Sequence, residues 1–297
     1  MMDEQHYTEK WSKRTGTSAI WQTVAPIYDR WVTLTKNRML RLYINKEQEL
    51  LDNYLAWILA RNPEKRISIL EIGSGTGRTL LCYAHKPTLI ERMEYLIGID
   101  NAPAMYDIAK YKLSQEASVL NHVENGSHII SKYVFLKMEA KKLSRYFYRG
   151  RVDARRLELE IEEEPVGILD EEKYNRSIKV VINMLNTLGV IKQSKSTVLR
   201  NMVMAAGPEG RIVVSVFNGK AFRDHAEDIY TSIRNIVGKF DKDDFDYSSN
   251  EFASQSYYSH WFTRTEIEGM MERAGCSNIR TKEIDNIGLF VTSEISK

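Results

Sequence analysis

The spacing of apolar residues changes along the chain and divides it into a helical start and a longer body of alternating elements. In residues 17–61 the apolar positions recur at helical spacing, and Asn62-Pro63 ends the last helix. We therefore expect residues 1–61 to form an N-terminal helical cap. The residues that carry the spacing are Leu50, Leu51, Tyr54, Leu55, Ile58 and Leu59.

Short apolar runs rich in Ile, Val and Phe dominate the body of the chain. They are nearly continuous in apolar character, which is typical of strands buried on both faces of a parallel sheet. Residues 279–284 and 288–295 predict a final antiparallel pair, after a helix that begins at Thr265 and ends near Gly275. The predicted fold class is α/β, doubly wound, over residues 62–297. The apolar runs are 67–73, 95–100, 133–138, 178–185 and 211–217.

Two stretches interrupt the alternation of strands and helices. In residues 144–176, apolar and acidic residues alternate, which predicts an inserted, half-exposed β-hairpin. Residues 218–262 are charged and aromatic and too long for a plain connection, so we interpret them as a lid or substrate segment. The alternating residues are Leu157, Leu159 and Ile161 against Glu158, Glu160 and Glu162.

Charge is segregated around the first of these stretches, with basic residues before acidic ones. Pairing of opposite charges across the strands of a hairpin is the favoured explanation. A basic patch for nucleic acid or another anionic partner is the alternative. The basic residues are Lys141, Lys142, Arg145, Arg149, Arg151, Arg155 and Arg156, and the acidic ones are Glu158, Glu160, Glu162, Glu163 and Glu164.

Composition narrows the class of protein. With 297 residues, 43% hydrophobic and 28% charged, the chain has the make-up of a globular protein, and a net charge of +2 gives no general attraction to nucleic acid. No apolar run approaches the roughly 18 residues that span a bilayer. The polar start lacks a signal-peptide core, so we expect a cytoplasmic protein without a membrane partner. Cys82 and Cys276 lie apart without a Cys/His cluster, so neither a disulfide framework nor a metal site is expected.

The strongest chemical signal is the segment ILEIGSGTGRTL, residues 69–80. It places Glu71, Gly73, Gly75 and Gly77 between a buried strand and a helix. Glycines leave the main chain bare and allow positive φ, as a nucleotide-like ligand requires at such a turn. A dinucleotide fingerprint would need its third glycine where the chain has Arg78, which disfavours a dehydrogenase.

The pattern E-x-G-x-G-x-G resembles the glycine motif of class I S-adenosylmethionine-dependent methyltransferases, and by motif order the resemblance covers residues 66–217. It implies a Rossmann-like seven-stranded mixed sheet in the order 3-2-1-4-5-7-6, with the last strand antiparallel. It also implies S-adenosylmethionine as the cofactor, S-adenosylhomocysteine as the product, and no metal. The residues placed beside the amino acid portion of the cofactor are Glu71, Gly73, Ser74, Gly75 and Gly77.

Two further positions match the family's cofactor contacts. Asp100, followed by Asn101, ends the second predicted strand, where the family's acidic residue binds the ribose hydroxyls. Glu139-Ala140 follows the third strand and resembles the acidic and small pair that meets the adenine amino group. The alternatives are a helix N-cap for Asp100 and a solvated loop carboxylate for Glu139.

Candidate acceptor residues follow the fourth strand and lie in the long segment. Asn183 and Asn186 occupy the position where the family faces the transferred methyl group and, for Asn183, the cofactor; backbone-bonding turn residues are the alternative. His260 is a candidate general base, since its ordinary pKa lies near neutral pH, and packing is the alternative. Tyr257 is the last catalytic candidate, and Tyr28, Asn218, Tyr258 and Trp261 are the candidates for substrate binding.

These features predict a methyltransferase that transfers a methyl group by direct in-line displacement to an N or O nucleophile of a small molecule. The chain lacks the N-P-P-Y motif of nucleobase amine methylation, a catalytic Cys for pyrimidines, and an acidic magnesium cluster at the fourth strand. An RNA methyltransferase acting on a cap-like guanine N7 is the first alternative, because of the basic residues in 141–156. A non-catalytic, cofactor-binding partner subunit is the second.

Overall fold

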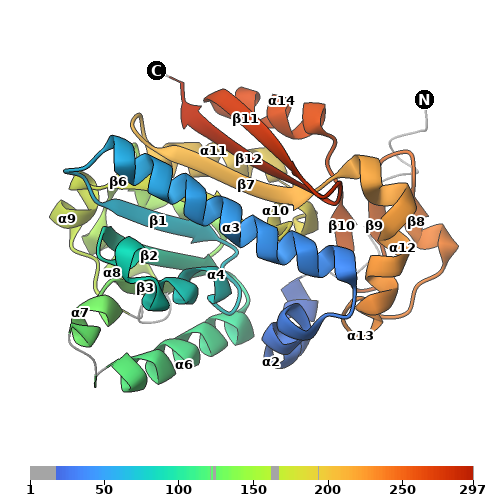
Figure 1. Ribbon diagram of the computed structural model, residues 1–297, viewed down its shortest axis with the longest axis horizontal. Coiled ribbons are helices and arrows are strands. Elements are labelled where there is room, and N and C mark those ends of the chain that lie inside the picture. The colour runs from blue at the N-terminus through green and yellow to red at the C-terminus, as the bar shows by residue number, and fades with distance from the viewer. Residues whose placement is uncertain (1–17, 121, 123–124, 162–166, 193, 297) are drawn as a thin grey trace.

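A seven-stranded sheet forms the centre of the computed structural model, which describes residues 18–120, 122, 125–161, 167–192 and 194–296 (Figure 1). Its order is β3-β2-β1-β6-β7-β12-β11, with β12 antiparallel to both of its neighbours. Counted along the chain this is 3-2-1-4-5-7-6, so the predicted fold class and strand order are confirmed. The strands are β1 (Ile67–Ile72), β2 (Met93–Asp100), β3 (Tyr133–Lys137), β6 (Ile178–Asn183), β7 (Arg211–Phe217), β11 (Cys276–Ile284) and β12 (Gly288–Ile295).

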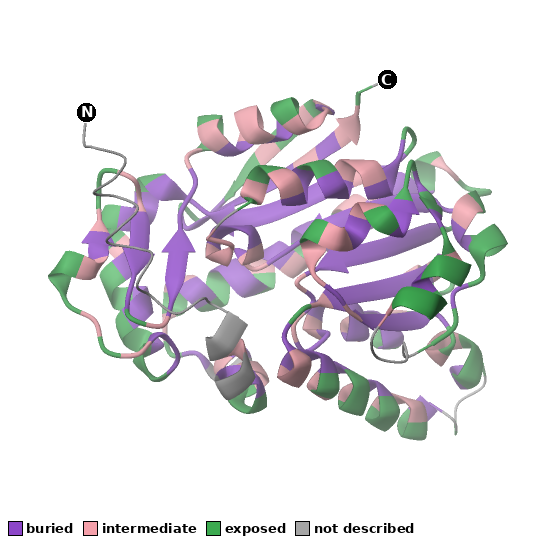
Figure 2. Cartoon of the chain, turned by 180° about the vertical axis from the view of Figure 1, so that it is seen from behind, coloured by how far each residue is buried: buried purple, intermediate pink, exposed green. Residues whose placement is uncertain are grey.

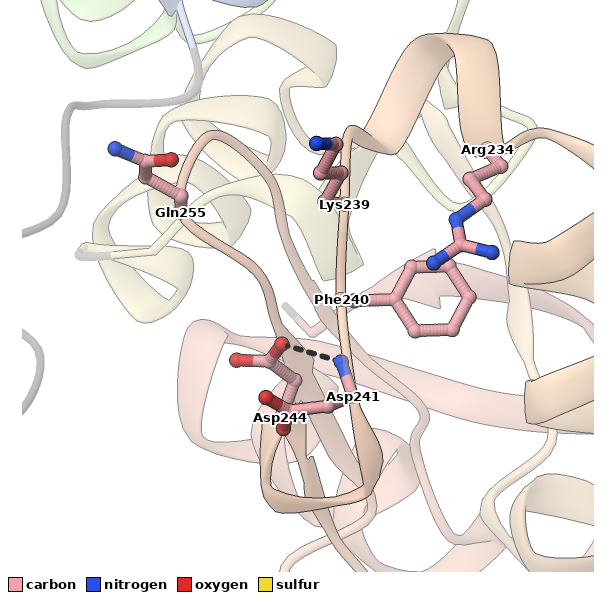
Figure 3. A pocket seen from close by; sticks show the side chains of 6 residues that line it. All are labelled: Arg234, Lys239, Phe240, Asp241, Asp244 and Gln255. Carbon is pink, nitrogen blue, oxygen red and sulfur yellow. Dashed lines mark hydrogen bonds between the residues drawn. The ribbon is translucent and has the colours of Figure 1, made fainter.

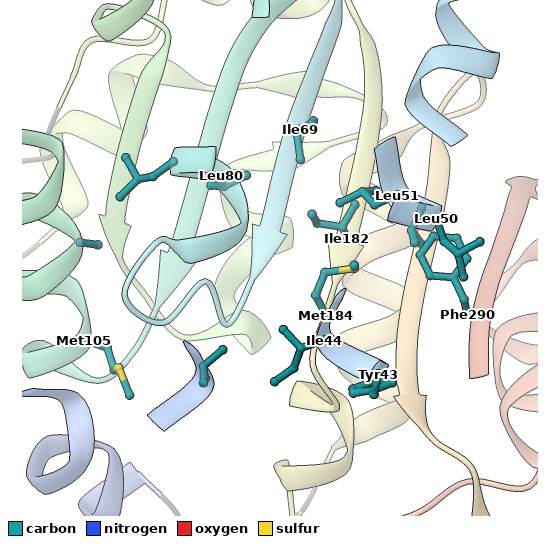
Figure 4. Close-up of a cluster of buried hydrophobic side chains, with 14 of the residues drawn as sticks. Tyr43, Ile44, Leu50, Leu51, Ile69, Leu80, Met105, Ile182, Met184 and Phe290 are labelled. Atoms are coloured by element: carbon teal, nitrogen blue, oxygen red, sulfur yellow. The ribbon is translucent and has the colours of Figure 1, made fainter. Parts of the chain in front are cut away.

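The central strand β1 is buried along its whole length, as its unbroken apolar sequence predicts. Ile69 pairs in parallel register with Leu96 of β2 on one side and Val180 of β6 on the other. Successive side chains enter opposite cores: Ile69 contributes to the core beneath α3 (Arg38–Arg61) (Figure 4), and Leu70 to the core on the other face. The strands of the sheet are largely buried (Figure 2).

Helices cover both faces of the sheet and make it a three-layer structure (Figure 1). The long helix α3 crosses one face, and α11 packs on the other beside α14. The helix α6 is also long, and the other helices between the strands of the sheet are short connections. The helices are α2 (Ser18–Leu34), α4 (Arg78–Leu81), α5 (Pro87–Ile90), α6 (Pro103–Leu120), α7 (Gly126–Ile130), α8 (Ala154–Glu160), α9 (Glu171–Arg176), α10 (Thr187–Val190), α11 (Lys195–Ala206) and α14 (Arg264–Ala274), with 3-10 turns η1 (Cys82–His85) and η2 (Ala140–Arg145).

Local sequence signals explain where the flanking helices begin and end. Asn37 caps α3 by accepting a hydrogen bond from the Leu40 amide at 3.0 Å. Thr263 and Glu266 form a capping box at the start of α14, and Gly275 ends that helix in the left-handed conformation. The final helix therefore begins at Arg264, close to the predicted Thr265.

The insertion at 144–176 contains a hairpin, but not where the alternating residues predicted one. The hairpin strands are β4 (Phe147–Tyr148) and β5 (Arg151–Val152), whereas Leu157 and Leu159 lie in helix α8. Asp153 caps this helix, and Arg156 pairs with Glu160 one turn along it at 2.8 Å. Glu162–Glu164 lie outside the described residues. Leu157 is buried and Leu159 is 77% exposed, so apolar residues two positions apart face opposite sides of a helix.

Segment 218–262 folds into short helices and a small antiparallel sheet beside the carboxyl edge, the edge at which the parallel strands end (Figure 1). Its interior is aromatic, with Tyr230 and Phe252 stacked at 3.9 Å between ring centroids. No helix in the described part of the chain is long and apolar enough to cross a membrane. The elements of the segment are η3 (Gly219–Ala221), α12 (Phe222–Ser232), α13 (Arg234–Val237), η4 (Lys242–Asp244), β8 (Phe245–Asp246), β9 (Glu251–Ala253) and β10 (Tyr258–His260).

Candidate active site at the carboxyl edge of the sheet

The glycine turn, residues 73–77, lies directly after β1 at the carboxyl edge. Gly73, Gly75 and Gly77 have φ of 70, 55 and 74°, so all three use the left-handed region that the motif predicts. A Cβ at Gly73 would collide with Cγ2 of Thr187 in α10. A Cβ at Gly75 would meet Met105 Sδ and Tyr28 Cε1 at 3.9 Å, an ordinary van der Waals distance, so the turn there lies against α2 and α6 without a clash.

Asp100, at the end of β2, is bonded to the glycine turn. Its Oδ2 accepts the Gly75 amide at 2.8 Å, and its Oδ1 accepts the Ala102 amide at 2.8 Å. Burial raises the pKa of Asp100, and these backbone hydrogen bonds oppose the rise without cancelling it. Asn101, next in the chain, is exposed.

Glu71 is a buried carboxylate directly behind the turn, with 3% of its surface exposed. Among the described residues, none is hydrogen bonded to its Oε2 atom. Burial raises its pKa to about 8, although the neighbouring Arg78 opposes the shift. A buried acceptor without a donor is costly, and a cationic ligand at the turn would supply one. Ser74 is buried beside it and fixes the turn through its amide, which donates to the Ile99 carbonyl at 3.0 Å.

Helix α2 docks on the glycine turn. Asp29 accepts a hydrogen bond from the Thr76 hydroxyl at 2.5 Å and pairs with Lys112 of α6 at 3.0 Å. Tyr28, one residue earlier, approaches Gly75, and burial raises its pKa. The N-terminal segment thus supplies one wall of the site.

Glu139 and Ala140 follow β3 at the same edge. Glu139 pairs with Lys141 at 2.7 Å and with Lys142 at 3.5 Å, and the hydrogen bond from Lys141 lowers its pKa. The Ala140 carbonyl accepts the side-chain amide of Asn201 at 3.0 Å. Two of the basic residues in 141–156 therefore have a carboxylate partner in Glu139.

Asn183 ends β6, and Asn186 lies in the turn that follows, residues 184–187, here called the β6 turn. Asn183 is completely buried: its Nδ2 donates to the Ile72 carbonyl at 3.0 Å and its Oδ1 accepts the Leu188 amide at 2.8 Å. Asn186 has φ 55° and its side chain bonds Ser259 and the Phe217 amide, both at 3.1 Å. Both side-chain amides thus join separate elements of the fold.

His260 lies between two carboxylates. Its Nε2 is 2.8 Å from Glu266 Oε1, and its Nδ1 is 3.4 Å from Glu251 Oε1, outside hydrogen-bond geometry. Burial alone lowers the His260 pKa, but the two carboxylates outweigh burial and raise it. Tyr258 donates to Glu251 at 2.6 Å and accepts from Lys195 at 3.3 Å, and burial lowers the Lys195 pKa to about 8. The carboxylates of Glu251 and Glu266 therefore favour the protonated form of His260.

The remaining acceptor candidates are Trp261, Asn218 and Tyr257, and they differ in what they contact. Trp261 is completely buried, and its indole N–H donates to the Tyr230 hydroxyl at 2.7 Å. Asn218 is buried and caps η3 by accepting the Lys220 amide at 3.1 Å. Tyr257, in contrast, contacts Trp21 of α2, with ring centroids 6.1 Å apart, and so lies where the long segment meets the helix that covers the glycine turn.

Glu47 and Arg78 are site residues that the sequence analysis gave no role in binding or positioning. Arg78 Nη2 lies 3.5 Å from Glu47 Oε2, and Glu47 is 1% exposed. One signal marks Glu47: it is a charged residue between Tyr43 and Leu51 on the buried face of α3.

Two hollows open on the described surface. One, of about 510 Å³, lies between α13, η4 and the loop after β9 (Figure 3). Its rim is held by the Asp241 amide, which donates to Asp244 at 3.1 Å, and Arg234 lies over Phe240 at 5.3 Å. The other, of about 410 Å³, opens beside α3 and reaches Arg78 and Cys82.

Comparison with solved structures identifies the fold. The chain matches the CcbJ methyltransferase from Streptomyces caelestis with a TM-score of 0.56 at 15% identity, covering 95% of this chain and 99% of that one. It matches magnesium protoporphyrin IX methyltransferase from Synechocystis, solved with bound S-adenosylhomocysteine, with a TM-score of 0.51 at 13% identity, covering 94% and 100%. No protein-family model matches the sequence, and no curated protein matches it. The chain has the fold of class I S-adenosylmethionine-dependent methyltransferases, as the glycine motif predicted.

Proposed function

We propose that the protein is an S-adenosylmethionine-dependent methyltransferase that acts on an N or O nucleophile of a small molecule. The observation that carries the proposal is the left-handed glycine turn with the Asp100 carboxylate bonded to it. In this proposal the cofactor lies along residues 73–77, with its ribose at Asp100 and Asn101 and its adenine at Glu139 and Ala140.

The residues present suit this cofactor. Glu71 offers a buried oxygen that no described donor bonds, which fits an ammonium group, and the glycines of the turn carry no side chain that would keep a ligand from the main chain. When bound, S-adenosylmethionine supplies a methyl group made electrophilic by its sulfonium. The protein then has to align the nucleophile and exclude water, which is worth about 7–11 kcal/mol in favourable cases.

We assign a proposed role to each candidate acceptor residue from the contacts of its side chain. Tyr28 and Tyr257 are proposed to line the acceptor space between α2 and segment 218–262, because rings of the two segments meet there. Asn183, Asn186 and Asn218 are proposed to position the surrounding turns, since their side chains bond the backbone. His260, Tyr258 and Trp261 are proposed to hold the segment in place.

No observation raises the RNA alternative above a small acceptor. The hairpin that carries Arg149 and Arg151 packs on Gly207 at the end of α11. That end of the helix precedes β7 and so lies at the edge of the sheet opposite the glycine turn. A basic surface there does not face the proposed methyl-transfer site.

The experiment is a binding and turnover series. Calorimetric titration with S-adenosylmethionine, S-adenosylhomocysteine and NAD decides the cofactor, and release of S-adenosylhomocysteine is then measured with fractionated small metabolites and with RNA. The proposal expects turnover with a metabolite fraction. Turnover with RNA only would favour the first alternative, cofactor binding without turnover in either fraction the partner subunit, and NAD binding alone would overturn the proposal.

A further inference from the structure

Glu47 is a buried carboxylate in the middle of a helix that otherwise buries apolar side chains. It lies on α3 one turn after Tyr43 and one turn before Leu51, both completely buried. Removing an ionised carboxylate from water costs several kcal/mol unless partners compensate. The partners of Glu47 therefore matter to the structure of the site.

Its two oxygens contact two different parts of the carboxyl edge. Oε1 accepts the backbone amide of Leu185, in the β6 turn, at 2.6 Å. Oε2 lies 3.5 Å from Nη2 of Arg78, the residue that follows the glycine turn. One side chain of the N-terminal segment thus joins the β6 turn to the residue that follows the glycine turn.

The β6 turn needs such an anchor. Leu185 has φ 51° and Asn186 has φ 55°, and each left-handed residue without a glycine is strained. The Asn186 amide is fixed by the Ser215 carbonyl at 3.0 Å, so Glu47 supplies the matching constraint at Leu185. Thr187, the next residue, packs directly on Gly73.

The charges around Arg78 make the contact responsive to the glycine turn. The charge of Arg78 acts on Glu71 as well as on Glu47 and lowers the pKa of both buried carboxyl groups. Burial raises the pKa of Glu47, and Arg78 is the largest influence that opposes the rise. Without the charge of Arg78 beside it, the ionised form of Glu47 is less favoured, and a neutral carboxyl oxygen accepts the Leu185 amide more weakly.

We propose that Glu47 is a positioning residue that couples the glycine turn to the β6 turn through Arg78 and the Leu185 amide. This deepens the proposed function, on which it rests only for the identity of the ligands at the two turns. A change at Arg78 is transmitted to the backbone on the acceptor side.

Hydrogen exchange of the ligand-free protein tests the coupling without any assumption about the cofactor. Peptides covering residues 183–190 should exchange about tenfold faster in Glu47→Gln, because the charge on the acceptor for Leu185 is lost. Arg78→Gln should have a similar effect, and the double variant should exceed neither single variant by much. Arg78→Lys keeps the charge and should stay near the wild type.

One control variant and one control peptide accompany these measurements. Glu49→Gln removes an exposed carboxylate of the same helix, paired with Lys46 at 2.6 Å, and should leave 183–190 unchanged. Unchanged exchange of a β12 peptide shows that each variant is folded. Arg78→Gln with no effect on 183–190, or rate increases of the two single variants that multiply in the double, would overturn the coupling.

Hydrogen exchange repeated in the presence of S-adenosylhomocysteine separates this inference from the proposed function. In the wild type, ligand should slow exchange at both 73–81 and 183–190; in Glu47→Gln it should still slow 73–81 and no longer slow 183–190. Equal slowing of both segments in Glu47→Gln contradicts the coupling. Absence of binding to the wild type contradicts the proposed function, while the ligand-free results still decide the coupling.

Discussion

The backbone amide of Gly75 donates a hydrogen bond to Asp100 Oδ2 at 2.8 Å, which joins the turn after β1 to the end of β2. The same carboxylate accepts the Ala102 amide through its other oxygen. Asp100 thus combines the two explanations considered from the sequence, a local backbone acceptor and a ligand-binding carboxylate. Each carboxylate oxygen can accept more than one hydrogen bond, so both functions are compatible.

Asp100→Ala should weaken S-adenosylhomocysteine binding by about 1.5–3 kcal/mol, or about 10- to 150-fold in Kd, through lost charged hydrogen bonds. Calorimetric titration of the folded variant measures the change. Asp107→Ala, an exposed aspartate on α6, is the matched control and should bind as the wild type does. Unchanged affinity in folded Asp100→Ala would contradict ribose binding at this residue.

Gly73→Ala should destabilise the protein by more than about 1 kcal/mol, because the added Cβ meets Thr187 Cγ2 and φ is 70°. The denaturant midpoint measures the loss. Thr187→Ser removes Cγ2, so the double variant should recover part of the stability and leave the φ cost. No recovery at all would show that contact with Thr187 is not what requires glycine here.

Glu71 predicts a pH-dependent affinity. Its pKa of about 8 in the ligand-free protein means that it is protonated at neutral pH, and a cationic ammonium prefers the ionised form. Affinity for S-adenosylhomocysteine should therefore rise as pH increases toward 8, by up to about tenfold per unit, with release of a proton. Calorimetry in buffers of different ionisation enthalpy measures this release. Glu71→Gln should flatten the dependence, and an equally steep one in that variant would sink the assignment.

The stability that His260 contributes should fall as pH rises, whereas the ligand affinity that depends on Glu71 should rise with pH. Its folded pKa lies above the ordinary 6.5, so its stabilisation is fully present below 6.5 and is lost as pH rises through the folded value. Glu251 and Glu266 favour the charged ring, and Lys195 opposes it. Urea midpoints of wild type and His260→Gln should differ most near pH 6 and converge at higher pH.

The control for His260 is His85→Gln, which removes a histidine that is 59% exposed and paired with Glu116 at 3.0 Å. Exposed ion pairs contribute little, so this variant should follow the wild type across the pH range. A wild type and His260→Gln difference that stays constant with pH would mean that packing, not charge, is the contribution of His260.

The sequence was sufficient where periodicity and backbone chemistry act locally. The unbroken apolar run of β1 predicted a strand buried on both faces, and the glycines at 73, 75 and 77 predicted a left-handed turn. It failed at Leu157 to Glu160, because so short an alternation does not exclude a helix once Asp153 supplies the cap and Arg156 pairs with Glu160.

The acceptor side was harder to predict because its polar residues act through distant partners. Asn183 bonds the Ile72 carbonyl 111 positions away, and Glu47 bonds the Leu185 amide 138 positions away. No local pattern reveals such pairs. Only the single charge on the buried face of α3 marked Glu47 beforehand, and its partners became known from the fold.

A crystal structure of the protein with S-adenosylhomocysteine tests the central claim most directly. The account predicts density for the ligand along residues 73–77, with ribose hydroxyls on Asp100, the ammonium at Glu71 and the sulfur facing the space between Tyr28 and Tyr257. Density elsewhere on the molecule, or an empty glycine turn at saturating ligand, would contradict it.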